Sequence, residues 1–297
     1  MSELKKLVAK ELSTLVDSRV SAMAAAIAAK HGAASRAVLF YGSCLREHEL
    51  DGLMLDFYLI VSDYRAAYAK RWLATANRLI PPNVFYFEHD GLASKYAVLS
   101  EADFARECDL GARTSSVFAR FAQPSRLVWA ADERARETAI DAVSRAASAL
   151  LELTRPSMSD AEAVDVLAIW KKAFRFSYGA EIRAESNSRP EMIVDSDPQR
   201  YRRFAEAAGF SERQQYSDDQ RRTSEEAWRH FQRRGRRASV LRLAKASLTF
   251  VNGADYIAWK INRHAGTDIR LKPWQQRHPL LAAITLLPKL IRSGAVR

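Results

Sequence analysis

The pattern of apolar and polar positions divides the chain into two unlike parts. Apolar residues recur at helical spacing over residues 3–31, and short apolar runs then predict buried strands. The runs span residues 37–41, 53–61, 84–87 and 95–99. From about residue 100 onward the spacing indicates helices, with predicted breaks at Pro124, Pro156, Ser186 to Pro190 and Gly209. We expect the polar stretch Ser211 to Arg222 to be the most mobile segment.

This layout predicts an α+β protein with three successive parts. Residues 1–130 form an α/β domain, and residues 131–238 form a helical domain. Residues 239–297 form a basic, amphipathic C-terminal segment. Nearly half of the 297 residues (48%) are hydrophobic, which is typical of a folded globular chain.

Composition excludes several classes of protein. Cys44 and Cys108 are too few for a disulfide scaffold or a cysteine-rich zinc module, and the six histidines show no metal-ligand spacing. The first residues mix both charges, unlike a signal peptide. The apolar run 280–287 is far shorter than the roughly 20 residues of a spanning helix. We expect a protein that is cytosolic or that lies on a membrane without crossing it.

The positive charge lies in the last quarter of the chain. The formal net charge is +11, yet residues 229–297 hold 15 Lys or Arg and only two acids, a net of +13. The other residues carry 31 basic and 33 acidic side chains, a net of −2. A division of this kind indicates that the C-terminal quarter meets an anionic partner.

The C-terminal segment mixes tryptophans, leucines and cations in a way that suits an anionic membrane surface. The residues predicted to contact the membrane are Trp259, Lys260, Arg263, Lys272 and Trp274. Nucleic acid is the competing anionic partner, but the segment contains no recognisable nucleic-acid module. A helical core with solvated charges is the remaining alternative, and the cluster Arg229 to Arg237 fits it as a solvated helix end.

One local motif carries chemistry. Gly42-Ser43 follows the first apolar run, and Asp56 interrupts the second. A carboxylate in such an apolar run needs a cation or a donor, and a Gly-Ser turn offers N–H groups and a hydroxyl to phosphate. A plain turn and a hydrogen-bonded aspartate would leave the same pattern. Two acids at positions i and i+2 of a strand would point to one face, but the residues at that spacing from Asp56 are Met54 and Tyr58. A second metal ligand must therefore come from elsewhere: Glu88 is the first choice, followed by Asp51 and Asp63.

This arrangement is similar to that of the nucleotidyltransferases related to DNA polymerase beta. A longer series of motifs resembles the mitochondrial-type phosphatidate cytidylyltransferases, also called mitochondrial translocator assembly and maintenance proteins, over roughly residues 36–265. The series is Tyr41-Gly-Ser43, Met54 to Phe57, Val84 to Phe87, Lys95-Tyr96, Ala119-Arg120, Gln123-Pro124, Ser177-Tyr178 and Ile182-Arg183. The residues Phe87 to His89 depart from the family pattern, and Glu181 stands where an aspartate is expected.

The resemblance implies a nucleotidyltransferase domain joined to a helical domain, which makes CDP-diacylglycerol and pyrophosphate from CTP and phosphatidic acid with Mg²⁺. It implies that Gly42 and Ser43 hold the triphosphate and that Asp56 binds the metal. Lys95, Arg120 and Arg183 are implied phosphate contacts, for which a solvated lysine and surface ion pairs are the alternatives. Two other functions stay open: a nucleotidyltransferase for RNA or a small molecule, and an inactive adaptor that binds nucleotide or lipid.

Overall fold

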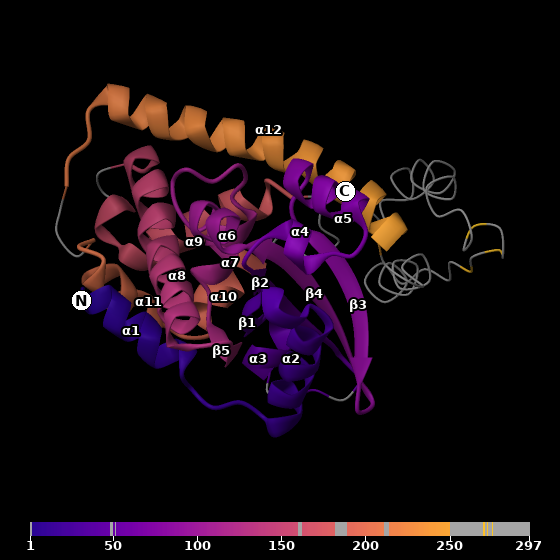
Figure 1. Ribbon diagram of the computed structural model, residues 1–297. Coiled ribbons are helices and arrows are strands. Elements are labelled where there is room, and N and C mark those ends of the chain that lie inside the picture. Colours follow the sequence, from indigo (N-terminus) through magenta and orange to yellow (C-terminus); the bar gives the residue numbers. More distant parts are fainter. Residues whose placement is uncertain are drawn as a thin grey trace.

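A mixed five-stranded sheet lies between two groups of helices (Figure 1). The computed structural model describes residues 2–47, 50, 52–159, 162–181, 189–210 and 214–249, together with 270, 272 and 275. The strand order is β3-β4-β2-β1-β5; β2 and β4 run parallel, and the other neighbouring pairs are antiparallel. The strands are β1 (Ser35–Tyr41), β2 (Met54–Val61), β3 (Asn83–His89), β4 (Leu92–Ser100) and β5 (Ser125–Ala130).

Twelve α-helices surround this sheet in the described part of the chain. Among them, none combines the length and the apolar composition that crossing a bilayer requires. Their bounds are α1 (Glu3–Leu12), α2 (Ser18–Lys30), α3 (Ser43–Glu47), α4 (Tyr64–Ala67), α5 (Arg71–Leu79), α6 (Glu101–Glu107), α7 (Ser116–Phe121), α8 (Glu133–Thr154), α9 (Val166–Tyr178), α10 (Arg189–Asp195), α11 (Pro198–Ala207) and α12 (Asp218–Thr249).

Both faces of the sheet are buried, which explains why its strands are apolar runs without strict alternation. Within β1, Ala37 and Leu39 pack on one face with side chains from α1 and from α6 to α12. Val38 and Phe40 point the other way, toward α2, α3, α4 and α5. The first of these two cores is continuous from the sheet to Phe231 in α12, so the helices after residue 130 share a core with the sheet.

The four strands and the breaks predicted near Pro156 and Gly209 are confirmed. Two predictions were wrong. The helix expected over residues 3–31 is two helices, because Asp17 accepts a hydrogen bond from Arg19 N–H and caps a new helix start. The segment after Pro124 is a strand rather than a helix, because β5 pairs with β1 at the sheet edge. The segment expected to be mobile is helical from Asp218 onward.

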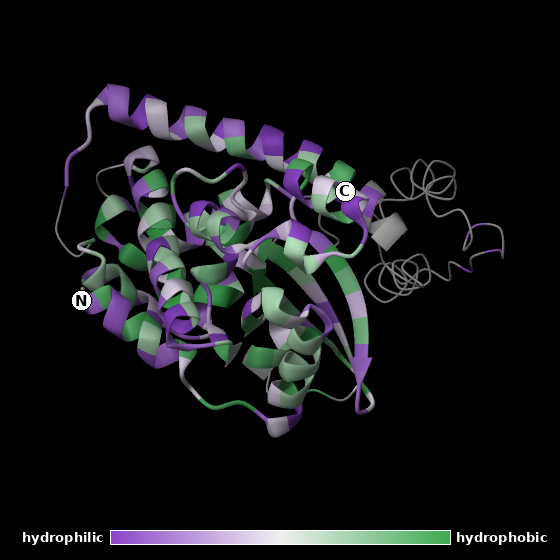
Figure 2. Cartoon of the chain, viewed as in Figure 1, coloured by the Kyte–Doolittle hydropathy of each residue, from purple (hydrophilic) through white to green (hydrophobic). Residues whose placement is uncertain are grey.

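Helix α12 packs along the helical group through one narrow side. Ser224, Trp228, Phe231 and Gly235 are buried at successive helical turns, whereas much of the rest of the helix is exposed and hydrophilic (Figure 2). At Gly235 the helix crosses the end of α9. A Cβ atom at this position would lie 2.4 Å from the carbonyl oxygen of Ala180, so only glycine allows the approach.

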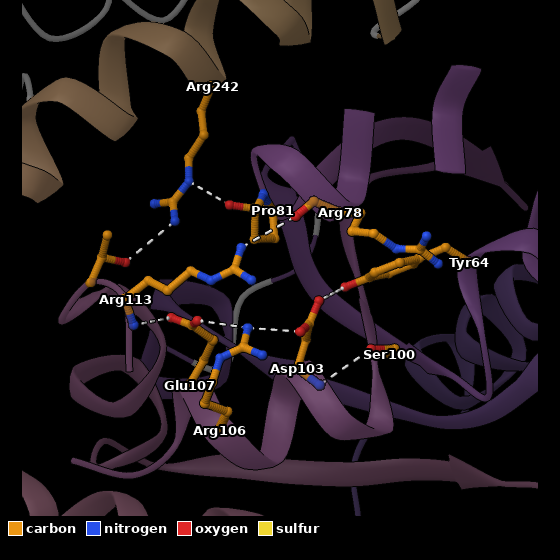
Figure 3. A network of polar contacts seen from close by, with 10 residues as sticks. Tyr64, Arg78, Pro81, Ser100, Asp103, Arg106, Glu107, Arg113 and Arg242 are labelled. Carbon is orange, nitrogen blue, oxygen red and sulfur yellow. Dashed lines mark hydrogen bonds and ion pairs between the residues drawn. The ribbon is translucent and has the colours of Figure 1, made fainter. Parts of the chain in front are cut away.

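The last described turns of α12 are fastened to the turn that leads into β3. Arg242 donates from Nε to the carbonyl of Pro81 at 2.7 Å, and from its Nη atoms to Ser116 Oγ (3.1 Å) and Thr114 Oγ1 (3.3 Å). Lys245 donates to the carbonyls of Ile80 and Pro82. Figure 3 shows Arg242 above a second polar network, in which buried Asp103 and Glu107 both pair with Arg106. The hydrogen bonds of Arg242 and Lys245 join α12 to the turn before β3, the edge strand of the sheet.

We predict that Gly235→Ala lowers the free energy of unfolding by about 1–3 kcal/mol, the usual cost of an overpacked contact. Helix propensity alone has the opposite sign, since alanine is about 1 kcal/mol better than glycine inside a helix. Urea denaturation followed by circular dichroism measures the difference. The control is Ser239→Ala in the same helix, which should be neutral or stabilising. A stabilised Gly235→Ala variant would show that α12 does not pack on Ala180.

Candidate functional site

The backbone of the Gly42 turn lies against the carboxylate of Asp56. Tyr41, the last residue of β1, pairs with Asp56 in the antiparallel register, so the turn that follows crosses directly over this side chain. Gly42 has φ +99°, and a Cβ atom built there would lie 2.8 Å from Asp56 Oδ2. Both the left-handed backbone and the close approach require glycine at this position.

Ser43 follows as the first, half-buried residue of α3. The Sγ atom of buried Cys44 contacts the carbonyl oxygen of Met54 at 3.6 Å, two residues before Asp56 on β2. This contact ties the start of α3 to the strand that carries the acid. The Gly-Ser turn and Asp56, which the sequence analysis placed in one site, are therefore brought together.

Lys95 of β4 is the charge partner of Asp56. The two residues are paired in the parallel register of β2 and β4, so their side chains share one face of the sheet. Lys95 Nζ lies 3.0 Å from Asp56 Oδ1, and the side chains are 26% and 16% exposed. The contact has the distance of an ion pair but not the direction of a hydrogen bond: Oδ1 is buried and accepts no hydrogen bond from a described residue. Such an oxygen has room in its coordination for a further donor or cation.

Arg120 of α7 faces the same side of the sheet. Its guanidinium lies over the rings of Tyr41 and Tyr58, with centroid distances of 5.1 and 5.8 Å, and donates to Tyr58 Oη at 3.0 Å. Burial raises the pKa of the Tyr41 phenol well above its usual value, so this ring stays neutral. Asp56 is close enough to act on both Tyr41 and Arg120 electrostatically. The site therefore brings the Asp56 carboxylate close to two cations, Lys95 and Arg120.

Tyr58 occupies the strand position at which a second acid would point to the same face as Asp56. Its side chain is 2% exposed, and its hydroxyl accepts the hydrogen bond from Arg120. Alternation along β2 was the signal that could have identified Tyr58 as a site residue. A phenol at this position orients an arginine and supplies no metal ligand of the usual kind.

Glu88 does not meet Asp56. We expected Glu88 to be the second metal ligand, but β4 lies between β3 and β2, so two strand spacings, roughly 10 Å, separate the backbones. Glu88 is exposed and accepts a hydrogen bond from Tyr86. Asp63 accepts from Arg65 N–H as the cap of α4, and Asp51 lies outside the described residues. Nowhere in the described part of the chain do three His, Cys, Asp or Glu side chains converge as metal ligands.

A polar connection from the helical side was missed by the sequence analysis. Glu181, just after α9, accepts a hydrogen bond from Ser116 Oγ, and Ser116 in turn accepts from Arg242. Glu181 also acts electrostatically on Tyr41 and Arg120. One hint was present in the sequence, namely the glutamate at position 181 where the resemblance leads one to expect an aspartate, but neither Ser116 nor Arg242 had a distinctive local signal. The connection runs from the site to α12.

The opposite face of β4 is a floor of aromatic side chains. Tyr96 is buried there, as expected for the neighbour of Lys95, and its hydroxyl lies 3.2 Å from His31 Nε2. His31 Nδ1 lies 3.0 Å from the carbonyl of Ala67, and burial lowers the pKa of the imidazole. These contacts give His31 a structural role.

Several predicted residues lie outside the described part of the chain. They are Arg183 among the phosphate contacts, and Trp259, Lys260, Arg263 and Trp274 among the membrane contacts. Lys272 is described; it is exposed, and its backbone N–H donates to Gln275 Oε1 at 2.8 Å. The roles given to these residues stay predictions.

No protein-family model and no curated protein matches the chain. Among solved structures, the chain is similar to a nucleotidyltransferase-like protein from Exiguobacterium sibiricum, with a TM-score of 0.30 and 10% sequence identity. The alignment covers 93% of this chain and 92% of that chain. A TM-score of this size does not establish a shared fold.

We predict that Gly42→Ala destabilises the protein by about 1–3 kcal/mol, because it adds left-handed backbone strain to a contact with the Asp56 carboxylate. The matched control is Gly91→Ala. Gly91 also has a positive φ, +75°, but a Cβ atom there meets nothing within 4 Å. Thermal and urea unfolding of both variants should give the larger loss at Gly42. Equal losses would mean that the turn does not press on Asp56.

Proposed function

We propose that the chain is a nucleotidyltransferase whose site is formed by Gly42, Ser43, Asp56, Lys95 and Arg120. The observation that carries the proposal is the Gly42 backbone pressed against Asp56, with Lys95 3.0 Å from the same carboxylate. Phosphoryl transfer depends mostly on positioning and charge neutralisation. A glycine turn, one acid and two cations at one end of a sheet supply both.

The carboxylate fits a metal that arrives with a nucleotide. Asp56 Oδ1 is a buried oxygen that accepts no hydrogen bond from the described residues. Mg²⁺ is typically held by one or two carboxylates together with substrate phosphates, so a single aspartate is an adequate protein ligand. When bound, the ion would supply charge neutralisation at the phosphates.

In the reaction that we propose, CTP and phosphatidic acid give CDP-diacylglycerol and pyrophosphate. An oxygen of the lipid phosphate attacks the α-phosphorus of CTP, and the bond to the pyrophosphate oxygen breaks. The attacking phosphate is already anionic at neutral pH, so no general base is needed. Lys95, as a point charge, and Arg120, as a planar donor, would hold phosphate oxygens while negative charge moves to the leaving group.

The choice of CTP and phosphatidic acid is supported by the ordered motifs from Tyr41 to Arg183 that resemble the phosphatidate cytidylyltransferases. The site residues alone would equally serve another nucleotide or an RNA acceptor. A lipid acceptor would place the protein peripherally at the cytoplasmic face of an anionic membrane. The basic segment of residues 239–297 supports that placement through its tryptophans and cations.

A second candidate function is a nucleotide-binding adaptor without transfer activity. Tyr58 favours it, because this phenol stands where a second carboxylate would face the site and instead accepts the hydrogen bond from Arg120. The two candidates differ in a single observable, namely turnover of the bound nucleotide.

We predict that Asp56→Asn lowers CTP-dependent pyrophosphate release on phosphatidic acid vesicles by roughly 100-fold or more, the order seen when a group that stabilises developing charge is lost. The amide keeps the shape of the side chain but removes its charge. Glu137→Gln, the same change at an exposed position of α8, is the control and should turn over as the wild type does.

The assay is run with each of the four nucleoside triphosphates and with phosphatidic acid or RNA as acceptor. Transfer to RNA alone would replace the lipid reaction with the RNA alternative. Nucleotide binding without any turnover by the wild type would support the adaptor. Undiminished turnover by a folded Asp56→Asn variant would refute the assignment of this carboxylate.

A further inference from the structure

A group of large apolar side chains is exposed where α5 meets α12. Trp72 and Leu79 are seven residues apart on α5, so their side chains lie on the same face of the helix. They are 46% and 71% exposed. Val240 and Leu241 on α12 are 50% and 51% exposed. We call these four residues, with the cations of both helices beside them, the α5–α12 surface.

Hydrogen bonds hold the last described turns of α12 to the residues that directly follow α5. Leu79 directly precedes Ile80, whose carbonyl accepts from Lys245 of α12. Arg242 donates to the next carbonyl, that of Pro81. Figure 1 shows the end of α5 beside the last turns of α12, at the edge of the molecule formed by β3. The end of α5, with Leu79, is therefore held next to the turns of α12 that carry Val240 and Leu241.

The same surface is strongly basic. At α5 the exposed cations are Lys70, which directly precedes the helix, Arg71 and Arg78. On α12 they lie on the turns that precede Val240 and are Arg229, Arg233, Arg234, Arg236 and Arg237. From residue 227 to residue 249 the sequence contains no acid. Among the described residues, these cations form one ion pair, between Arg78 and Asp63 at 4.0 Å. Their charge is thus left largely for an external partner.

We propose that the α5–α12 surface lies on an anionic lipid bilayer. Exposed tryptophan and aliphatic side chains enter the boundary between headgroups and acyl chains, while arginines beside them meet the lipid phosphates. Only at such a boundary do the arginines and the exposed apolar side chains both find favourable surroundings. This inference goes beyond the proposed reaction, because binding to vesicles requires neither nucleotide nor turnover.

Two other occupants fit the surface less well. A second copy of the chain would bring one arginine-rich face against another, and like charges at an interface are repulsive. Nucleic acid would use the arginines, but Leu79, Val240 and Leu241 would gain nothing from a phosphate backbone. Both occupants are measurable outcomes of the same experiment.

The experiment is flotation of the full-length chain with vesicles of phosphatidylcholine alone and of phosphatidylcholine with phosphatidylglycerol. One variant replaces the apolar group (Trp72→Ser, Leu79→Ser, Val240→Ser, Leu241→Ser), and another reverses two charges (Arg233→Glu, Arg237→Glu). Their matched controls are Leu15→Ser with Met192→Ser, and Arg202→Glu with Arg203→Glu, all exposed residues away from the surface. Exposed positions of this kind rarely affect folding.

On the anionic vesicles, we expect the partition coefficient of each variant to fall roughly tenfold or more, with both controls binding as the wild type does. Wild-type affinity in both variants would overturn the proposal and leave vesicle binding to other parts of the chain. Failure of the wild type to bind anionic vesicles would also overturn it. So would a charge variant that keeps vesicle binding but loses a labelled oligonucleotide, or an apolar variant whose only defect is loss of a concentration-dependent dimer.

Discussion

One half-buried carboxylate, that of Asp56, constrains the centre of this molecule. It points to a sheet face that is covered by helices, and its buried Oδ1 atom needs a partner of opposite charge. The parallel register of β2 and β4 places Lys95 beside it, 3.0 Å from Oδ1. The turn after β1 must then pass over the same side chain, which only glycine at position 42 permits. Register, ion pair and turn thus depend on one another, and the residues that serve the fold here are also those that we assign to the nucleotide.

Much of this arrangement was predictable from the sequence, for a definite physical reason. The strands are apolar on both faces, so their runs stand out, and an acid inside such a run, as at Asp56, is conspicuous. What could not be predicted is which strands become neighbours. We expected Glu88 next to Asp56, but β4 lies between their strands, and Lys95 of β4 takes that place. Strand β5 was missed because its six residues form a strand only by pairing with β1.

The contacts made by helices are less visible in sequence than those made by strands. Ser116 and Arg242 are ordinary residues in their local contexts, and 126 positions separate them. Their hydrogen bond exists because α12 crosses α9 at Gly235 and ends over the turn before β3. The same crossing turns the opposite side of α12 outward, and that side carries the arginines of the cluster 229–237, for which a solvated helix end was one of the alternatives. In the structure the helix continues past these arginines to Thr249. They adjoin exposed Val240 and Leu241 rather than acids, so a solvated helix end does not describe them fully.

The position of α12 relates the two proposals by geometry. Its inner side reaches Glu181 through Ser116, and its last turns hold the start of β3, the edge strand of the sheet. From that edge, two strand spacings of about 4.8 Å lead across β4 to β2 and Asp56. A bilayer in contact with the α5–α12 surface would therefore lie beside the β3 edge of the sheet, which is closer to Lys95 than the β5 edge is. The Pro81 turn, which Arg242 and Lys245 hold in place, directly precedes β3 at that edge. The α12 contacts would thus order both the membrane surface and the sheet edge from which the strand of Asp56 is two strand spacings away.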